Sequence, residues 1–516
     1  MNLTTLAAAH GDKPAVVMAG SGRSLSYREL EEHSNRIAHF FHRIGLRAGD
    51  HIAVLMENQL ELFPVVWAAQ RSGLFYTPVN WHLSEAETAY IVENCGARVL
   101  ISSASLEPLA RVAAASAPAL ERRLLVGPGV EGVEELTEVV SGLPADPLPD
   151  AVEGYYMFYS SGTTGRPKGI KPELTGEPFG TGLNIDAVMA RSFGFGPDSV
   201  YLSPGPLYHA SPLGWSLGTV RNGGTVVVME RFDATGALEA IQRYGVTHGQ
   251  FVPTMFVRML KLPAEQRQVY DVSSLRVVVH AAAPCPVEVK RQMIDWLGPI
   301  LLEFYAGSEG NGMCIIGSES WLRHPGSVGP AVRGTIHICD DGGVELGPNQ
   351  VGTIWFGDTA RFAYHGDPEK TASAFDERGW STLGDIGHVD EEGYLYLSDR
   401  RTDLILSGGV NIYPREIEDL LTLHPAVADV AVIGLPDPEM GERVHAVVQP
   451  ADPASVGDGL AVELIAFCRG RMAHYKAPRS VSFEDVPRLP SGKVLRRVLK
   501  QRHTDGSVLP KTAGAR

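Results

Sequence analysis

The sequence predicts an α/β protein with two doubly wound subdomains and a small β-barrel, followed by a small α+β C-terminal domain. Strand-like apolar runs alternate with amphipathic helical stretches between residues 26 and 305, and such alternation produces parallel sheets with helices on both faces. From about residue 325, short apolar runs are separated by turns rich in Asp and Gly, a pattern typical of antiparallel strands. A new series of helices and strands begins after residue 400.

The first unit opens with a capping box. Ser26 is followed three residues later by Glu29, ahead of apolar residues at helical spacing. Strands are expected at 51–56, 75–79 and 98–101, with one helix ending near residue 72 and another opened by a second capping box, Ser84 with Glu87. Residues 111–150 are rich in Ala, Pro and Glu, and we expect a helix and a surface linker there.

The second unit and the C-terminal part follow the same logic. Strands are expected at 225–229, near 251, at 275–280 and at 300–305, with helices from Asp233 and over 254–262 and 286–296. Between about 325 and 399, turns at 340–343 and 390–393 predict the barrel-like subdomain. A helix from Pro414, strands at 427–434, 443–449 and 480–485 and a helix at 461–472 predict the last domain. We therefore expect an N-terminal domain of residues 1–399 and a C-terminal domain of residues 400–516.

Composition excludes several classes of function. The net charge of −15 over 516 residues disfavours binding to nucleic acid or to an anionic membrane surface. The apolar stretch at 52–69 is interrupted by Glu57 and Glu61, so we expect no membrane span. The five cysteines form no Cys-x-x-Cys pair, which favours a reduced, cytoplasmic protein without a disulfide framework or zinc site.

A glycine-rich loop at 159–169 is the strongest functional signal. Its glycines allow close approach of backbone to a ligand, its hydroxyls and amides can donate hydrogen bonds, and Lys168 adds positive charge. These features suit the phosphates of a nucleotide triphosphate. Lys168 is followed by Gly169 rather than by Ser or Thr, which disfavours a Walker A loop. The candidate phosphate-binding residues are Ser160, Ser161, Gly162, Thr163, Thr164, Gly165 and Lys168.

This loop resembles the signature loop of the adenylate-forming superfamily, which contains acyl-CoA synthetases, peptide-synthetase adenylation domains and luciferases. Four further segments are similar to motifs of that family, in the family's order, and extend the resemblance over nearly the whole chain: 305–310, 380–385, 399–403 and 489–493. The resemblance implies ATP-dependent activation of a carboxylic acid, with Mg²⁺ bound to the nucleotide and a C-terminal domain that moves about a hinge near residue 400.

The resemblance also implies roles for individual residues. In the family, the aromatic ring at Tyr305 packs on adenine, a carboxylate at Asp385 binds the ribose hydroxyls, and Glu309 holds the metal. A mobile lysine at Lys493 would bridge the acid and the α-phosphate, and this residue is the principal catalytic candidate. Thr402 differs from the usual Asp or Lys, so the hinge pivot stays open. The remaining nucleotide and metal candidates are Ala282, Ala283, Ser308, Arg400 and, for the metal, Thr164 with Glu309.

The same resemblance implies an acyl pocket and an acceptor tunnel. His209 either gates the pocket, as a catalytic residue, or is a packed histidine. Amino-acid-activating relatives place an Asp near this position to pair with the substrate's ammonium, and its absence predicts an acid without an α-amine. We expect a medium-sized apolar acid. The pocket candidates are His209, Trp215, Phe251, Ala281 and Gly307, and the tunnel candidates are Ser407, Gly408 and Gly409.

The expected activity is therefore an acyl-CoA ligase that uses ATP, Mg²⁺ and coenzyme A as co-substrate. An amide ligase that couples the acyl-adenylate to an amino acid is the main alternative, because the motifs do not distinguish the two acceptors. An adenylation domain that loads a carrier protein is less favoured, since no carrier motif follows Lys493. A non-catalytic adenylate-binding protein would be expected to lack Lys493 or Glu309, and both are present. A homodimer is compatible with all of these.

Overall fold

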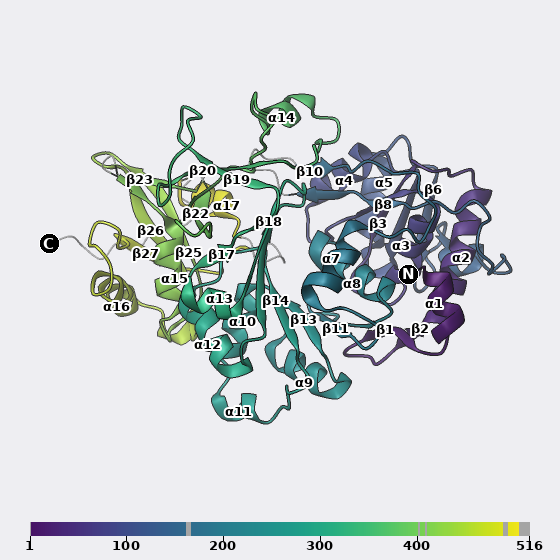
Figure 1. The fold of residues 1–516 in the computed structure, drawn as a ribbon, viewed down its shortest axis with the longest axis horizontal. Helices are drawn as coiled ribbons and strands as arrows, with labels where there is room; N and C mark the ends of the chain where they lie inside the picture. Colours follow the sequence, from purple (N-terminus) through teal and green to yellow (C-terminus); the bar gives the residue numbers. More distant parts are fainter. Residues whose placement is uncertain (1, 161–166, 401–402, 408–409, 489–493, 505–516) are drawn as a thin grey trace.

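The computed structural model describes residues 2–160, 167–400, 403–407, 410–488 and 494–504. Two helix-covered sheets, an antiparallel sheet and a C-terminal domain are arranged from one end of the molecule to the other (Figure 1). The predicted mixed α/β class is confirmed. Within the described residues, no helix is both long and apolar enough to cross a membrane.

The first sheet contains six strands, and all of its neighbouring strands are parallel. Both predicted capping boxes are present, at Ser26 and Ser84, and each begins a helix beside this sheet. The strand order is β7 (Glu134–Glu135), β6 (Arg122–Val126), β5 (Val99–Ser103), β3 (His51–Leu55), β4 (Phe75–Pro78) and β8 (Tyr155–Tyr156). The helices of this unit are α2 (Tyr27–Arg43), α3 (Leu62–Arg71), α4 (Glu85–Asn94), α5 (Glu107–Ala115) and α6 (Leu136–Val139).

The expectation for residues 111–150 was incomplete. This stretch contains β6, which pairs in parallel with β5, and not only a helix and a linker. The strand begins with Arg122 and Arg123, whose charged side chains hide the short apolar run that follows.

The second sheet has nine strands and carries the candidate site at its carboxyl edge. Six strands of this sheet run parallel, namely β1, β11, β12, β13, β14 and β15, while β2, β16 and β18 pair antiparallel at its two edges. Its order is β18 (Ala331–Arg333), β16 (Met313–Gly317), β15 (Leu301–Ala306), β14 (Val277–His280), β13 (His248–Phe251), β11 (Val200–Ser203), β12 (Thr225–Val228), β1 (Pro14–Met18) and β2 (Ser24–Ser26). The N-terminal strands thus belong to the second sheet, not to the first.

Two helix layers cover this sheet. One face packs on α7 (Asn184–Phe193) and α8 (Ala210–Arg221), with Trp215 and Phe193 in its core. The other face packs on α9 (Ala234–Tyr244), α10 (Pro253–Leu260) and α12 (Val287–Leu297), with Ile241, Phe256 and Met293 in a separate core. A doubly wound arrangement follows, as the alternation predicted.

The antiparallel subdomain expected from about residue 325 is a five-stranded sheet. Its order is β17 (Ser327–Gly329), β22 (Leu395–Arg400), β21 (Asp385–Val389), β20 (Gly352–Gly357) and β19 (Thr335–Cys339). A separate hairpin is formed by β9 (Phe158–Ser160) and β10 (Lys168–Ile170). The aromatic run 155–159 is divided between this hairpin and β8 of the first sheet.

The C-terminal domain packs helices on a mostly antiparallel sheet around its own apolar core. It contacts the rest of the chain through Arg415, which donates a 2.7 Å hydrogen bond to the Leu397 carbonyl, and through Lys261, whose ammonium contacts the Val427 carbonyl. The sheet consists of β24 (Val410–Ile412), β23 (Ile405–Ser407), β26 (Gly441–Pro450), β25 (Val427–Asp437) and β27 (Ser480–Phe483), with helices α15 (Pro414–Thr422), α16 (Asp458–Arg469) and α17 (Arg496–Thr504). The remaining helical segments are α1 (Leu3–His10), η1 (Ala104–Leu106), α11 (Ala264–Gln268), α13 (Ser318–Arg323), α14 (Pro368–Ser373) and η2 (Pro453–Ser455).

Candidate active site

The candidate nucleotide site begins at the carboxyl ends of β14 and β15. These strands are parallel neighbours, with His280 opposite Glu303, so the residues that follow them come to the same edge of the sheet. This is where ligands bind in open α/β sheets. Ala282 follows β14 with φ of +74°, a left-handed conformation that an L residue rarely adopts. Such strain is typical of functional sites.

A hydrogen bond joins the two residues predicted to bind the nucleoside. Tyr305, in β15, donates from its phenol to Asp385 Oδ2 at 2.7 Å. Asp385 is the first residue of β21, in the antiparallel sheet, and it pairs in register with Arg400 of β22. The structure therefore brings Tyr305, Asp385 and the backbone of Arg400 together, although they are up to 95 positions apart in the sequence.

Glu309 lies beside a tyrosine that sequence reasoning did not identify. The phenol of Tyr364 donates to Glu309 Oε1 at 3.0 Å, and the Lys168 ammonium lies 5.4 Å from the centroid of the Tyr364 ring. Burial lowers the pKa of Lys168, as does the nearby Lys370, whereas Glu309 acts in the opposite direction. The sequence around Tyr364 shows only a turn and a helix start at Asp367-Pro368, so nothing local marks it as a site residue.

Gly307 lies where these elements pack closely against each other. A Cβ on this residue would lie 2.3 Å from Leu383 Cδ1 and 3.1 Å from Glu309 Oε2. Leu383 comes two residues before Asp385. The segment after β15, which carries the predicted metal ligand, thus packs against the segment that carries the predicted ribose acceptor. Ser308 is exposed beside it.

The residues on either side of the glycine loop form the β9–β10 hairpin. Ser160 and Lys168 are paired across this hairpin, so the two ends of the loop lie next to each other in space. The predicted phosphate residues Ser161, Gly162, Thr163, Thr164 and Gly165 lie outside the described residues, as do Lys493, Gly408 and Gly409. Their predicted roles stay predictions.

His209 begins helix α8 as its N-cap residue. Burial lowers the pKa of His209 to about 4, so the imidazole is neutral near pH 7. Its Nε2 atom is buried without a hydrogen-bond partner among the described residues. A buried polar atom of this kind is usually satisfied by water or ligand.

The other predicted pocket residues divide between the two cores. Trp215 is 2% exposed and stacks on Phe304 with ring centroids 5.7 Å apart. Phe251 lies in the opposite core, where its ring centroid is 5.7 Å from that of Phe256. Side chains alternate along a strand, so it is the preceding residue, Gln250, that contacts Ser211 of α8. Gln250 is a pocket candidate that an apolar search of the sequence missed.

The remaining predicted residues occupy two separate places. Ala281 is buried directly after β14, and Ala283 follows the strained Ala282. Ser407 is buried at the end of β23 in the C-terminal domain, where it pairs with Val410 and Gly441.

The donor set suits a nucleotide-bound Mg²⁺. No cluster of three or more potential metal-binding side chains occurs within the described ranges. Mg²⁺ in nucleotide enzymes takes one or two carboxylates and completes its shell with substrate phosphates and water. The single carboxylate of Glu309, oriented by Tyr364 and next to Lys168, fits this requirement.

The fold and these residues define a nucleotide-dependent ligase that activates its substrate as an adenylate. The chain belongs to the AMP-binding enzyme family, whose sequence model matches residues 3–362. Residues 416–493 match the AMP-binding enzyme C-terminal domain.

Two curated relatives cover nearly the whole chain. The fatty acid–[acyl-carrier-protein] ligase ScoC of Streptomyces coeruleorubidus is 33% identical over 95% of this chain and 93% of its own length. The long-chain-fatty-acid–CoA ligase FadD13 of Mycobacterium tuberculosis is 33% identical over 93% of each chain. Both relatives are named as fatty-acid ligases, one with an acyl-carrier protein and the other with CoA.

Solved structures agree with the fold. ATP-bound MatB from Rhodopseudomonas palustris superposes with a TM-score of 0.80 at 28% identity, covering 98% of this chain and all of the other. The amide bond synthetase McbA from Marinactinospora thermotolerans also gives a TM-score of 0.80, at 27% identity over 97% of this chain and 99% of its own. The same fold therefore serves more than one acceptor.

Proposed function

We propose that this protein joins a carboxylic acid to the thiol of coenzyme A in two steps. In the first step, a carboxylate oxygen bonds to the α-phosphorus of ATP, and pyrophosphate leaves. In the second step, the thiol sulfur bonds to the acyl carbon, AMP leaves, and the thiol proton passes to solvent. Acyl-AMP is the intermediate that links the two steps.

One observation carries this proposal: the Tyr305–Asp385 hydrogen bond joins the nine-stranded sheet to the antiparallel sheet, and the Tyr364–Glu309 hydrogen bond lies beside Lys168 of the β9–β10 hairpin. Each side chain has a matching task on ATP. Asp385 offers two acceptor oxygens to the vicinal ribose hydroxyls, and Lys168 offers an ammonium to the phosphates. Glu309 would hold Mg²⁺, which neutralises charge on the phosphates.

The residues outside the described ranges complete the proposal. The loop hydroxyls of Ser161, Thr163 and Thr164 would bind phosphate oxygens, with Thr164 near the metal. Lys493 would bridge the attacking carboxylate and the α-phosphate and lower their repulsion in the transition state. Rotation of the C-terminal domain would then replace Lys493 with the segment at Ser407, Gly408 and Gly409, whose small side chains leave room for the acceptor arm.

Coenzyme A is the acceptor that the FadD13 likeness favours. The carrier-protein reading, less favoured from the sequence, gains support from ScoC. The same pantetheine thiol is present in coenzyme A and in a pantetheinylated carrier protein, so the chemistry of the second step is shared. The McbA likeness supports an amine as the second candidate acceptor.

The acid we propose is medium-sized, largely apolar and free of an α-amine. Trp215 and Phe304 form an apolar wall, while Gln250 and Ser211 offer one polar position. The sequence around His209 has no Asp that would pair with the ammonium of an amino acid, and burial keeps the imidazole neutral by lowering its pKa. The five free, buried thiols favour a reducing cytoplasm as the compartment.

Product mass spectrometry tests the proposal. Enzyme, ATP and Mg²⁺ are incubated with a panel of carboxylic acids and with coenzyme A, a pantetheinylated carrier, an amino-acid mixture, or no acceptor. We expect an acyl-CoA mass only in the coenzyme A reactions. If an acyl-carrier or N-acyl product formed instead, the acceptor would be the carrier protein or the amine and not coenzyme A. If neither acyl-AMP nor any other product formed across the panel, acid activation would be refuted.

A further inference from the structure

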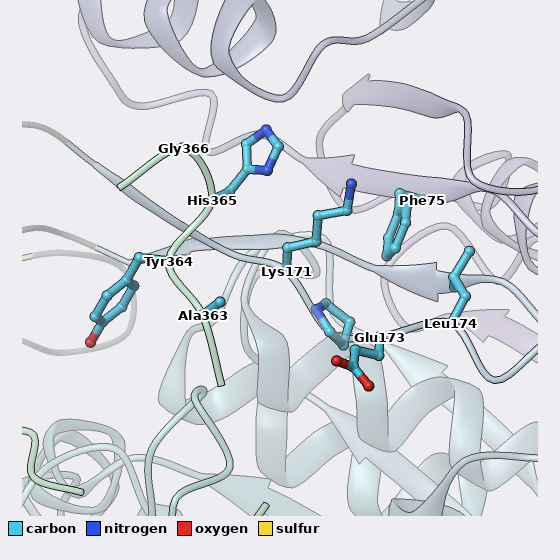
Figure 2. Close-up of a pocket in the computed structure, with 9 residues that line it drawn as sticks. Phe75, Lys171, Glu173, Leu174, Ala363, Tyr364, His365 and Gly366 are labelled. Atoms are coloured by element: carbon cyan, nitrogen blue, oxygen red, sulfur yellow. The ribbon is translucent and has the colours of Figure 1, made fainter. Parts of the chain in front are cut away.

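A pocket of about 590 Å³ lies behind the strand that carries Lys168. Figure 2 shows its lining, in which Lys171 and His365 face one region while Phe75 and Leu174 form an apolar side. The side chain of Tyr364 extends away from the side chains of Lys171 and His365. The pocket is thus formed by the segment just after β10, by β4 and by the loop at 363–366.

This pocket and the nucleotide site are on opposite sides of one extended segment. Lys168 and Lys171 are three positions apart, and residues an odd number apart in extended chain point to opposite sides. Accordingly, the Lys168 ammonium lies over Tyr364 at 5.4 Å, and that of Lys171 lies over Phe75 at 4.5 Å. The amide of His365 donates to the Gly169 carbonyl at 2.8 Å, which fixes the loop to this segment. The pocket is therefore separate from the residues assigned to ATP.

Lys171 is held by a neutral group rather than by a carboxylate. Its ammonium lies 3.0 Å from His51 Nε2, so it donates to the imidazole, and the proton of that ring must sit on Nδ1. His51 is 8% exposed, and its Nδ1 has no partner among the described residues. No carboxylate in the described part of the chain lies within ion-pair distance of Lys171. One positive charge is left unpaired at the pocket.

The directions of the pKa shifts agree with a missing anion. Burial lowers the pKa of Lys171. Burial, Lys171 and His365 together lower the pKa of His51 to about 4, against the opposing effect of Asp50. The ring of His365 is 6.0 Å from that of His51, and burial and Lys171 lower its pKa too. Groups that could carry positive charge disfavour one another's protonation, as expected where no counter-ion is present.

We propose that this pocket is a second binding site, for a monocarboxylate with an apolar body. The carboxylate would pair with Lys171, and the body would lie against Phe75, Pro172 and Leu174. A single ammonium matches a single negative charge, whereas a phosphate dianion normally requires several donors. Glu173 lines the same pocket and limits affinity by repulsion.

The test separates this site from the active site. Enzyme is first titrated with a non-hydrolysable acyl-sulfamoyl-adenosine, which occupies the proposed acid and nucleotide sites. Failure of this first titration would count against the proposed function alone. The saturated enzyme is then titrated by calorimetry with octanoate, with benzoate and with inorganic phosphate.

We expect one carboxylate to bind per saturated chain, more tightly than phosphate. Lys171→Met should weaken this binding at least about tenfold, the loss of one charge-assisted contact, and Glu173→Gln should strengthen it about twofold to threefold. Both variants should bind the adenylate analogue as wild type does, which excludes misfolding as the cause. No carboxylate binding to the saturated enzyme, unchanged binding in Lys171→Met, or equal binding of phosphate would overturn the proposal.

Discussion

The phenol of Tyr305 donates a 2.7 Å hydrogen bond to Asp385, and this contact connects the nine-stranded sheet to the antiparallel sheet. The aromatic ring proposed to face adenine and the carboxylate proposed to face ribose are therefore fixed relative to each other before a nucleotide binds. A preorganised site of this kind loses less entropy when it binds its ligand.

Asp385→Asn should weaken ATP binding by about tenfold to a hundredfold, since a charge-assisted hydrogen bond contributes about 1.5–3 kcal/mol. The amide keeps the shape but presents only one acceptor oxygen to the two ribose hydroxyls. The measurement is the KM for ATP and for 2′-deoxy-ATP in wild type and variant. Wild type should prefer ATP, and the variant should lose most of that preference.

Tyr305→Phe provides the matched control for this experiment. It removes the hydrogen bond to Asp385 but keeps the ring, so we expect a change in KM of only a few-fold with ribose discrimination intact. If Asp385→Asn retained full discrimination between the two nucleotides, the ribose role of Asp385 would be wrong.

Glu309→Gln should lower the rate of acyl-AMP formation by about two to three orders of magnitude, similar to the loss of other electrostatic groups in active sites. The amide cannot replace a charged oxygen ligand of Mg²⁺. Pyrophosphate release is measured over a range of Mg²⁺ concentrations, and the variant should require more Mg²⁺ for its half-maximal rate. Tyr364→Phe, which removes only the 3.0 Å contact to Glu309, should show a smaller shift in the same direction.

Lys493→Ala should largely abolish acyl-AMP formation while ATP binding is mostly retained. The reason is that Lys493 would act on the transition state between two anions, and not on the bound nucleotide. Pyrophosphate release and nucleotide affinity are measured separately, with Lys500→Ala as a control on a nearby lysine that pairs with Glu442. Wild-type rates of pyrophosphate release in Lys493→Ala would refute its assignment.

Local signals in the sequence predicted much of the fold correctly. The capping boxes at Ser26 and Ser84 depend on residues only three positions apart, and such patterns can be read directly. By contrast, β1 pairs with β12 more than 200 positions away. No local pattern reports that pairing, because it depends on which edge of the second sheet is left open.

The candidate site shows the same division. Tyr305, Asp385 and Glu309 were predicted because they belong to segments that resemble family motifs, and the structure brings the first two into contact. Tyr364 was missed because its contact with Glu309 joins elements 55 positions apart, within a stretch that reads only as a turn. Phe251 was predicted as a pocket residue from the resemblance, whereas the alternation of β13 turns its neighbour Gln250 toward α8.

Buried neutral histidines should make the protein less stable in mild acid. Burial, as the largest cause, lowers the pKa of His248 to about 4 and that of His445 to about 3. Their unfolded pKa is about 6.5, so between pH 6.5 and pH 4 the unfolded chain binds more protons than the folded chain. The free energy of unfolding must therefore rise with pH through this window and fall as the pH is lowered. For His445, the loss between pH 7 and pH 5 should be about 2 kcal/mol.

The measurement is the urea midpoint at pH 7 and pH 5. His445 is fully buried and bonded to Ser480 and Ser482, so His445→Gln should lower stability at pH 7 but make the midpoint less dependent on pH. His10→Gln, at an exposed helix end, should leave the pH dependence unchanged. An equal fall in midpoint for wild type and His445→Gln would show that carboxylates, and not this histidine, cause the acid sensitivity.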